Sequence, residues 1–398
     1  MAGNTRAKGK DEMRASPYLP APNAAASVPE PAPRTTIRHW PDRRILDLFG
    51  IDLPIVQAPM AGIATADLAI AVARAGGLAS LPCTLLSPDQ MRTEIEAIRR
   101  TTRPVNVNFL CHAPATIDHA RGTWHRRLAP YYVELGLNPA ASPALMDIPT
   151  FGGAQCELVE ELRPNVVSFH FGLPDPRLVE RVRATGANIL SSATTVAEAV
   201  WLEDHGCDVI IAQGLEAGGH RGMFLSDDMS TQVGTMALVP EIVDAVGVPI
   251  IAAGGIADAR GIVAALALGA SAVQIGTAYL LCPEARTPPV HRRTLMAGQH
   301  QTAVTNLFTG RPARAIVNRI MRDLGPMSDD APAFPLAGAA LAPLRAKTEP
   351  AGSADFVPMW CGQAAHLARE LSAAYLTRSL AETALEMLAE RRGILRRA

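Results

Sequence analysis

A short stretch near the middle of the chain combines residues that can carry chemistry with an unusual number of glycines. The sequence AQGLEAGGHRG, residues 212–222, places Gln213, Gly218 and His220 directly after the apolar run 209–211. An imidazole with its ordinary pKa of about 6.5 can exchange a proton near neutral pH. The glycines carry no side chain, so the backbone around His220 can lie against a flat ligand or a phosphate. The pattern predicts His220 as a catalytic residue, with a surface histidine as the alternative.

Two further glycine motifs follow later apolar runs. Gly254 and Gly255 come after residues 250–253, and the pair Gly276 and Thr277 follows residues 272–275. Backbone N–H groups can approach phosphate oxygens where side chains are missing, and a following helix N-terminus adds a favourable dipole. Tight turns alone could also require glycines. Two such turns on adjacent strands favour a phosphate site.

Polar side chains stand at the ends of several apolar runs. Asn108, Gln213 and Gln274 would bring three amides to one place, which fits a heterocycle with alternating donors and acceptors, such as an isoalloxazine. His170 and His112 end two other runs, and no third ligand has the spacing of a metal site, so no metal is expected. His170 is expected on the substrate side, with a structural hydrogen bond as the alternative. The Met and Trp of PMWCGQ, residues 358–363, are expected in the core.

Eight short apolar runs alternate with helical stretches and must position these residues. The helical units begin near a Thr or Asp and end at a Gly, as in TADLAIAVARAGG and ADARGIVAALALG. Eight strands buried on both faces predict a parallel (β/α)8 TIM barrel, whose site lies at the carboxyl ends of the strands. A doubly wound open sheet is the alternative, but no GxGxxG follows the first run. The expected strands are 55–58, 78–81, 105–110, 166–171, 189–192, 209–212, 250–253 and 272–275.

The units give a domain division of the chain. Residues 1–42 mix Ala, Pro, Ser and charged residues without periodicity, which is typical of a disordered tail. Residues 43–284 are expected to form the barrel, because the strand–helix units begin and end there. Residues 285–398 are less regular, and a C-terminal helical and irregular subdomain over the barrel mouth is expected from them.

Composition limits the partners and the compartment. The 398 residues include 37 Lys and Arg against 38 Asp and Glu, so neither nucleic acid nor a membrane surface is an expected partner. No apolar stretch reaches the roughly 20 residues that span a bilayer. The six cysteines form no CxxC pair and are expected as reduced thiols in the cytoplasm. A homodimer is left open.

The motifs together resemble the nitronate monooxygenase family, formerly called 2-nitropropane dioxygenases, whose members are FMN-dependent TIM barrels. The resemblance runs from about residue 45 to about residue 380. It rests on QAPMAG, VNVNFLCH, SFHFGLP, AQGLEAGGHRG, IIAAGGIADARGIVAALALGASAVQIGTAYL and GRPARAIVNRIM.

The resemblance implies a cofactor and the residues that hold it. FMN would bind without a covalent link in the barrel domain, and His220 matches the catalytic histidine of the family. Gly62 of the first loop would lie against the ring beside Met60. The implied cofactor-binding residues are Met60, Asn108, Gln213, Gly218, Gly255, Gln274, Ile275, Gly276, Thr277 and Ala278.

The resemblance also implies a reaction. The family oxidises an alkyl nitronate with O2 to a carbonyl compound and nitrite, so the expected partners are a small nitro or nitronate compound and O2. His220 would act as a base toward a neutral nitroalkane, or as a hydrogen-bond donor to an anionic nitronate. One alternative is an FMN-dependent NAD(P)H:quinone or enoyl-acyl-carrier-protein reductase with the same barrel. Another is a non-catalytic flavin-binding barrel.

Overall fold

The computed structural model describes residues 40–101, 103–114, 120–141, 148–298 and 300–395. The expected tail, residues 1–42, lies outside these ranges apart from its last three residues. Of those three, Trp40 is buried in the main hydrophobic core, and Asp42 accepts a hydrogen bond from the Ser271 hydroxyl at 2.5 Å. Among the described residues, no helix has the length and apolar character needed to cross a membrane.

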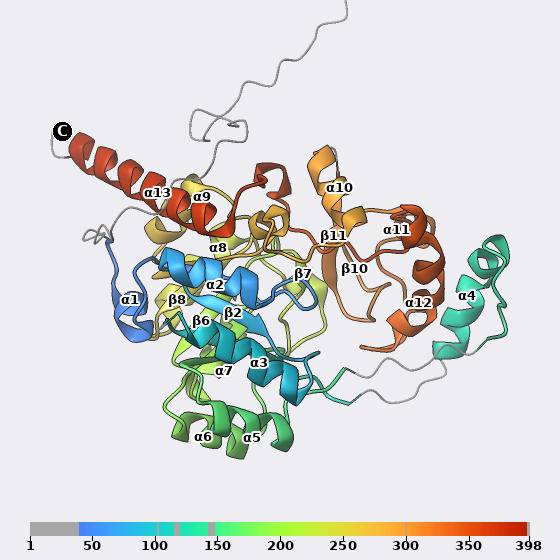
Figure 1. The fold of residues 1–398 in the computed structure, drawn as a ribbon, viewed down its shortest axis with the longest axis horizontal. Coiled ribbons are helices and arrows are strands. Elements are labelled where there is room, and N and C mark those ends of the chain that lie inside the picture. Colours follow the sequence, from blue (N-terminus) through green and yellow to red (C-terminus); the bar gives the residue numbers. More distant parts are fainter. Residues whose placement is uncertain (1–39, 102, 115–119, 142–147, 299, 396–398) are drawn as a thin grey trace, which may run out of the picture.

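An eight-stranded parallel barrel forms the centre of the molecule (Figure 1). All eight strands expected from the sequence are present, and their ends differ from the expected ones by at most one residue. Backbone hydrogen bonds from Leu78 to Ile55 and from Gln57 to Leu78 join the first strand to the second and close the barrel. The strands, in their spatial order, are β1 Ile55–Gln57, β9 Ala272–Ile275, β8 Ile250–Ala253, β6 Val209–Gln213, β5 Asn188–Ala193, β4 Val166–His170, β3 Val105–Leu110 and β2 Ala79–Pro82.

Eight helices surround the barrel, and local sequence signals fix their ends. Thr195 and Asp258 cap two of them by accepting hydrogen bonds from backbone N–H groups of the first turn. Gly76 ends the first at a positive φ, a conformation that residues with a Cβ rarely adopt. The helices are α2 Ala66–Ala75, α3 Pro88–Arg99, α5 Gly153–Leu162, α6 Pro176–Ala184, α7 Val196–Asp204, α8 Thr235–Ala245, α9 Ala259–Ala267 and α13 Ala373–Leu395.

The last helix, α13, completes this ring although it begins almost a hundred residues after the last barrel strand, β9. Helix α13 packs against both α9 and α2, and it thereby fills the place between these two helices in the ring (Figure 1). Leu376, Leu380 and Ala384 are buried in the same core as the barrel strands. The domain limits 43–284 and 285–398 remain a prediction, whereas the packing places α13 in the ring of barrel helices.

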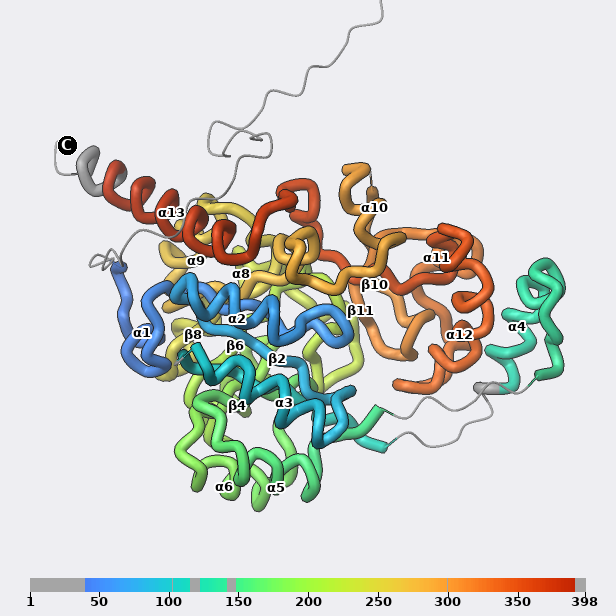
Figure 2. The backbone as a smooth tube through the Cα atoms, viewed as in Figure 1, coloured from blue at the N-terminus to red at the C-terminus, as the bar shows by residue number. Residues whose placement is uncertain are grey.

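A second hydrophobic cluster lies over the barrel mouth. It combines α4 Ala120–Glu134, which follows β3, with α11 Arg319–Asp323 and α12 Ala337–Thr348. Figure 2 shows α4 beside α12 although about 200 residues separate them in the chain. A three-stranded sheet joins this cluster to the barrel, in the order β10 Thr302–Thr305, β11 Ala313–Ile316 and β7 Gly219–His220. The remaining helices of six residues or more are α1 Arg44–Phe49 and α10 Pro289–Ala297.

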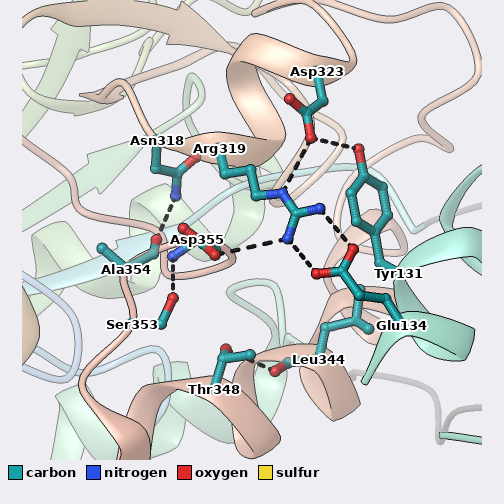
Figure 3. Close-up of polar contacts among 10 residues, drawn as sticks. All are labelled: Tyr131, Glu134, Asn318, Arg319, Asp323, Leu344, Thr348, Ser353, Ala354 and Asp355. Carbon is teal, nitrogen blue, oxygen red and sulfur yellow. Dashed lines mark hydrogen bonds and ion pairs between the residues drawn. The ribbon is translucent and has the colours of Figure 1, made fainter. Parts of the chain in front are cut away.

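Polar contacts attach α4 firmly to the rest of the cluster (Figure 3). The Arg319 guanidinium donates two hydrogen bonds of 2.7 Å to the Glu134 carboxylate, and its Nε donates to Asp323 at 3.3 Å. The Tyr131 hydroxyl donates to the same Asp323 carboxylate. On the buried side, Trp124 donates to the Ala337 carbonyl of α12. These contacts hold α12 over the mouth of the barrel.

Candidate active site

A cavity of about 1090 Å³ opens at the carboxyl ends of the barrel strands, beneath the second cluster. This is the edge at which the barrel prediction places the site. Three of the predicted residues do not line the cavity: Ile275 and Ala278, which are buried in the core, and Gly62. Eleven predicted residues line the cavity: Met60, Asn108, His170, Gln213, Gly218, His220, Gly254, Gly255, Gln274, Gly276 and Thr277.

His220 belongs to the two-residue strand β7, which pairs antiparallel with β11. This pairing carries the histidine from the barrel loop into the sheet beneath the second cluster. Its ring Nε2 lies 3.0 Å from the Thr309 hydroxyl. The rings of Phe334 and Trp360 lie 5.5 Å and 5.3 Å from its ring, between centroids. One face of the site is therefore aromatic.

Burial among these rings lowers the pKa of His220 to about 3. The nearby groups His170, Arg311 and His112 act in the same direction, because a positive charge on any of them opposes protonation of His220. Burial likewise lowers the pKa of His170 to about 4. Both imidazoles are therefore neutral at pH 7, so His220 presents one N–H donor and one unprotonated ring nitrogen.

His170 holds the backbone of His220. Its Nε2 lies 3.2 Å from the His220 carbonyl, which can only accept, so Nε2 carries the proton. Its Nδ1 then accepts a hydrogen bond of 3.0 Å from the Ser192 hydroxyl. Gln213 donates from Nε2 to the same carbonyl at 3.0 Å, and its Oε1 accepts from the Gly222 N–H at 2.8 Å. The structure thus gives His170 a structural hydrogen bond, and its predicted contact with substrate remains a prediction.

Two buried arginines fix the loop between Gln213 and His220. The Arg221 guanidinium donates to the carbonyl of Gln213 at 2.7 Å and to that of Gly214 at 2.6 Å. Arg314 of β11 donates from Nε to the next carbonyl, that of Leu215, at 2.9 Å. Burial lowers the pKa of Arg221 to about 10. Three consecutive carbonyls are thus bound by guanidinium groups, one of which comes from the sheet over the barrel mouth.

The glycine motifs and amides leave polar groups open to a ligand. No described residue accepts a hydrogen bond from the backbone N–H of Gly255 or Gly276. The Oε1 of Gln274 is buried and has no partner among the described residues. Asn108 donates from Nδ2 to the carbonyl and the hydroxyl of Ser168, which leaves its Oδ1 for a ligand. These groups fit a ligand with both acceptors and donors, such as a flavin phosphate with its ring.

Several residues beside His220 could not be predicted from the sequence. Thr309, Phe334 and Trp360 line the cavity, although Trp360 was expected in the core; Met359 is indeed in the core. The motif GRPARAIVNRIM begins at Gly310, directly after Thr309, and no local pattern indicates that the Thr309 hydroxyl meets His220. No group of three or more His, Cys, Asp or Glu residues in the described ranges is arranged to hold a metal ion.

Comparisons with known proteins agree with this geometry. A family model described as nitronate monooxygenase matches residues 42–383. A nitronate monooxygenase from Pseudomonas aeruginosa is 41% identical over 348 residues, covering 85% of this chain and 98% of that protein. A second, from Paraburkholderia phytofirmans, is 42% identical over 346 residues, covering 85% of this chain and 94% of its own.

Solved structures show the same arrangement. A nitroalkane oxidase from Streptomyces ansochromogenes superposes with a TM-score of 0.78 at 37% identity, covering 87% of this chain and 99% of that one. FabK from Thermotoga maritima superposes with a TM-score of 0.67 at 27% identity, covering 88% of this chain and 98% of its own.

Proposed function

The chain belongs to the nitronate monooxygenase family, and we propose that it oxidises alkyl nitronates with O2 to a carbonyl compound and nitrite, with FMN as its cofactor. The family makes the chain a flavin-dependent oxidoreductase. The observation that carries the proposal is the position of His220: a neutral imidazole that lines the cavity beside open amide and backbone N–H groups.

The described residues fit FMN. Gly255 and Gly276 line the cavity, and their N–H groups have no acceptor among the described residues, which suits phosphate oxygens. The unpartnered Oε1 of Gln274 and the free Oδ1 of Asn108 suit the donors of the flavin and its ribityl chain. Gln213, Gly218, Thr277 and Met60 of the predicted set also line the cavity, whereas Ile275 and Ala278 are buried in the core. When bound, FMN supplies the electron transfer from the nitronate carbon to oxygen.

His220 can take either of two roles, and its contact with the Thr309 hydroxyl is compatible with both. A hydroxyl can donate or accept, so Thr309 can pair with either tautomer of the ring. If Nε2 carries the proton and donates to Thr309, Nδ1 is free to remove a proton from a neutral nitroalkane. If Thr309 donates to Nε2, Nδ1 carries the proton and donates a hydrogen bond to an anionic nitronate. No described residue bonds to Nδ1, so this nitrogen is left for the substrate.

The experiment that tests the proposal measures oxygen uptake and nitrite release by the flavin-loaded protein with a series of alkyl nitronates. We expect both products in the wild type, and loss of turnover in His220→Asn with unchanged flavin absorbance. Wild-type protein that consumes no oxygen with any nitronate would contradict the function. Equal turnover in His220→Asn would support a binding-only role for the histidine.

A reductase is the second candidate, because FabK shares the fold at 27% identity over nearly its whole length. NADH oxidation with a quinone or an enoyl thioester as acceptor tests it directly. A rate with NADH above the rate with nitronate would favour the reductase.

We also propose that the protein is located in the cytoplasm, since all six cysteines are free thiols. The homodimer remains a prediction.

A further inference from the structure

A half-buried arginine stands behind the site without a carboxylate partner. Among the described residues, Arg311 forms no ion pair, and its Nε is buried without an acceptor. Its Nη2 donates to the Met223 carbonyl. Asp227 and Glu198 act on it only from farther away, and burial lowers its pKa. Placing a cation in apolar surroundings without a counter-ion is costly, so the charge needs another reason to be there.

Phe171 contacts both this charge and the histidines of the site. The Arg311 guanidinium carbon lies 3.9 Å from the centre of the Phe171 ring. The same ring meets His220 edge-on at 5.9 Å and His170 at 4.6 Å, between centroids. Phe171 adopts φ of 72°, a conformation that is unfavourable for a residue with a bulky side chain. The backbone is thus held in an unfavourable conformation with the ring seated between guanidinium and imidazole.

We propose that Arg311 makes the site selective for an anionic substrate, because its guanidinium stacks on the Phe171 ring beside His220 and forms no ion pair with a described carboxylate. This inference rests on the proposed function and names the residue that distinguishes a nitronate anion from a neutral nitroalkane. Arg311 does not line the cavity, so it attracts the anion without touching it. It is a positioning residue rather than a catalytic one.

The surrounding charges support this role. The other titratable groups that act on His220 are His170 and His112, and no carboxylate is among the groups that act on it. The buried Arg221 adds to the same field at His170. Of the two arginines that line the outer cavity, Arg345 is paired with Glu349 at 2.9 Å. The other, Arg293, is not among the groups that act on His220, whereas Arg311 is.

The size of the effect follows from Coulomb's law. The two ring separations place the guanidinium within about 10 Å of the His220 ring, and an effective dielectric constant of about 20 then gives roughly a tenfold preference for an anion.

The test compares variants of the flavin-loaded protein. Arg311→Gln and Arg311→Met remove the charge, and Met also fills the apolar space over Phe171 if Gln disturbs folding. Arg311→Lys keeps the charge. Arg322→Gln, on the exposed surface of α11, is the matched control for a lost positive charge. The measurements are the Kd of inorganic nitrite, followed by the flavin absorbance, and kcat/KM for ethyl nitronate and for neutral nitroethane.

We expect the two neutral variants to bind nitrite and to use ethyl nitronate about tenfold less well, with kcat/KM for nitroethane changed less than twofold. Arg311→Lys should stay within about threefold of the wild type, and Arg322→Gln should equal it. Unchanged nitrite affinity in the neutral variants would overturn the proposal. Equal losses in Arg311→Lys and Arg311→Met would also overturn it, because packing alone would then explain them.

Nitrite binding needs no turnover. If the wild type oxidises no nitronate, the proposed function fails, while the nitrite titration still decides the role of Arg311.

Discussion

Replacing Gly218 by Ala tests the packing that holds the cofactor loop. A Cβ at this position would lie 2.5 Å from the backbone nitrogen of Gly362 and 2.6 Å from the carbonyl carbon of Cys361. Both are backbone atoms, so no side chain can turn away to relieve the overlap. The sequence suggested that this glycine leaves room for a flat cofactor. The structure shows that it also leaves room for the chain at residues 361–362.

The magnitude follows from the overlap. Ordinary contacts of a Cβ with backbone begin at 3.4 Å, so the loop and residues 361–362 must separate by about 1 Å. Overpacking of this kind costs about 1–3 kcal/mol. Since Gly362 also donates its N–H to the Thr277 hydroxyl at 2.9 Å, the displacement reaches a predicted cofactor residue. We expect Gly218→Ala to lower the free energy of unfolding by that amount and to weaken FMN binding.

The assay combines urea unfolding of the flavin-free protein with titration of FMN by its fluorescence. Gly153→Ala is the matched control, because Gly153 is exposed at the start of α5 and a Cβ there meets nothing within 4 Å. The Gly153→Ala protein should have a midpoint of urea unfolding at least as high as that of the wild type. A Gly218→Ala protein with wild-type stability and wild-type FMN affinity would refute the reasoning.

Three further predictions concern other residues. Thr309→Val removes the hydroxyl that pairs with His220, and we expect kcat to fall about 2–10-fold, measured as nitrite release, with FMN binding unchanged. Arg221→Leu leaves the carbonyls of Gln213 and Gly214 without donors, so urea unfolding should show a loss of about 2–5 kcal/mol. Burial lowers the pKa of His291 from 6.5 to about 4, so the unfolded chain binds the proton first. As the pH falls from 6.5 to about 4, the free energy of unfolding should therefore decrease by about 1.4 kcal/mol per pH unit because of this group. His291→Gln should remove this part of the pH dependence.

The barrel could be predicted because its signals are local. Each strand is a short run buried on both faces, and each helix begins and ends at residues that restrict the backbone, such as Asp258 and Gly76. Parallel strands bring their carboxyl ends to one edge. His220 and Asn108, which are 112 positions apart in the sequence, could therefore be assigned to one cavity.

The surroundings of His220 could not be predicted in the same way. Strand β7 has only two residues, and its partner β11 lies more than ninety positions later, so no periodicity announces either. The contact with Thr309 and the aromatic face from Phe334 and Trp360 depend on that pairing. The packing of α4 on α12 is equally remote in sequence. Long-range pairs of this kind leave no local pattern.

The most direct test of the proposed reaction mixes the flavin-loaded protein anaerobically with an alkyl nitronate in one sample and with NADH in another, while the flavin absorbance is followed. We predict that the nitronate bleaches the flavin rapidly and that NADH does not. Rapid bleaching by NADH with no change by any nitronate would contradict the account and assign the protein to the reductases.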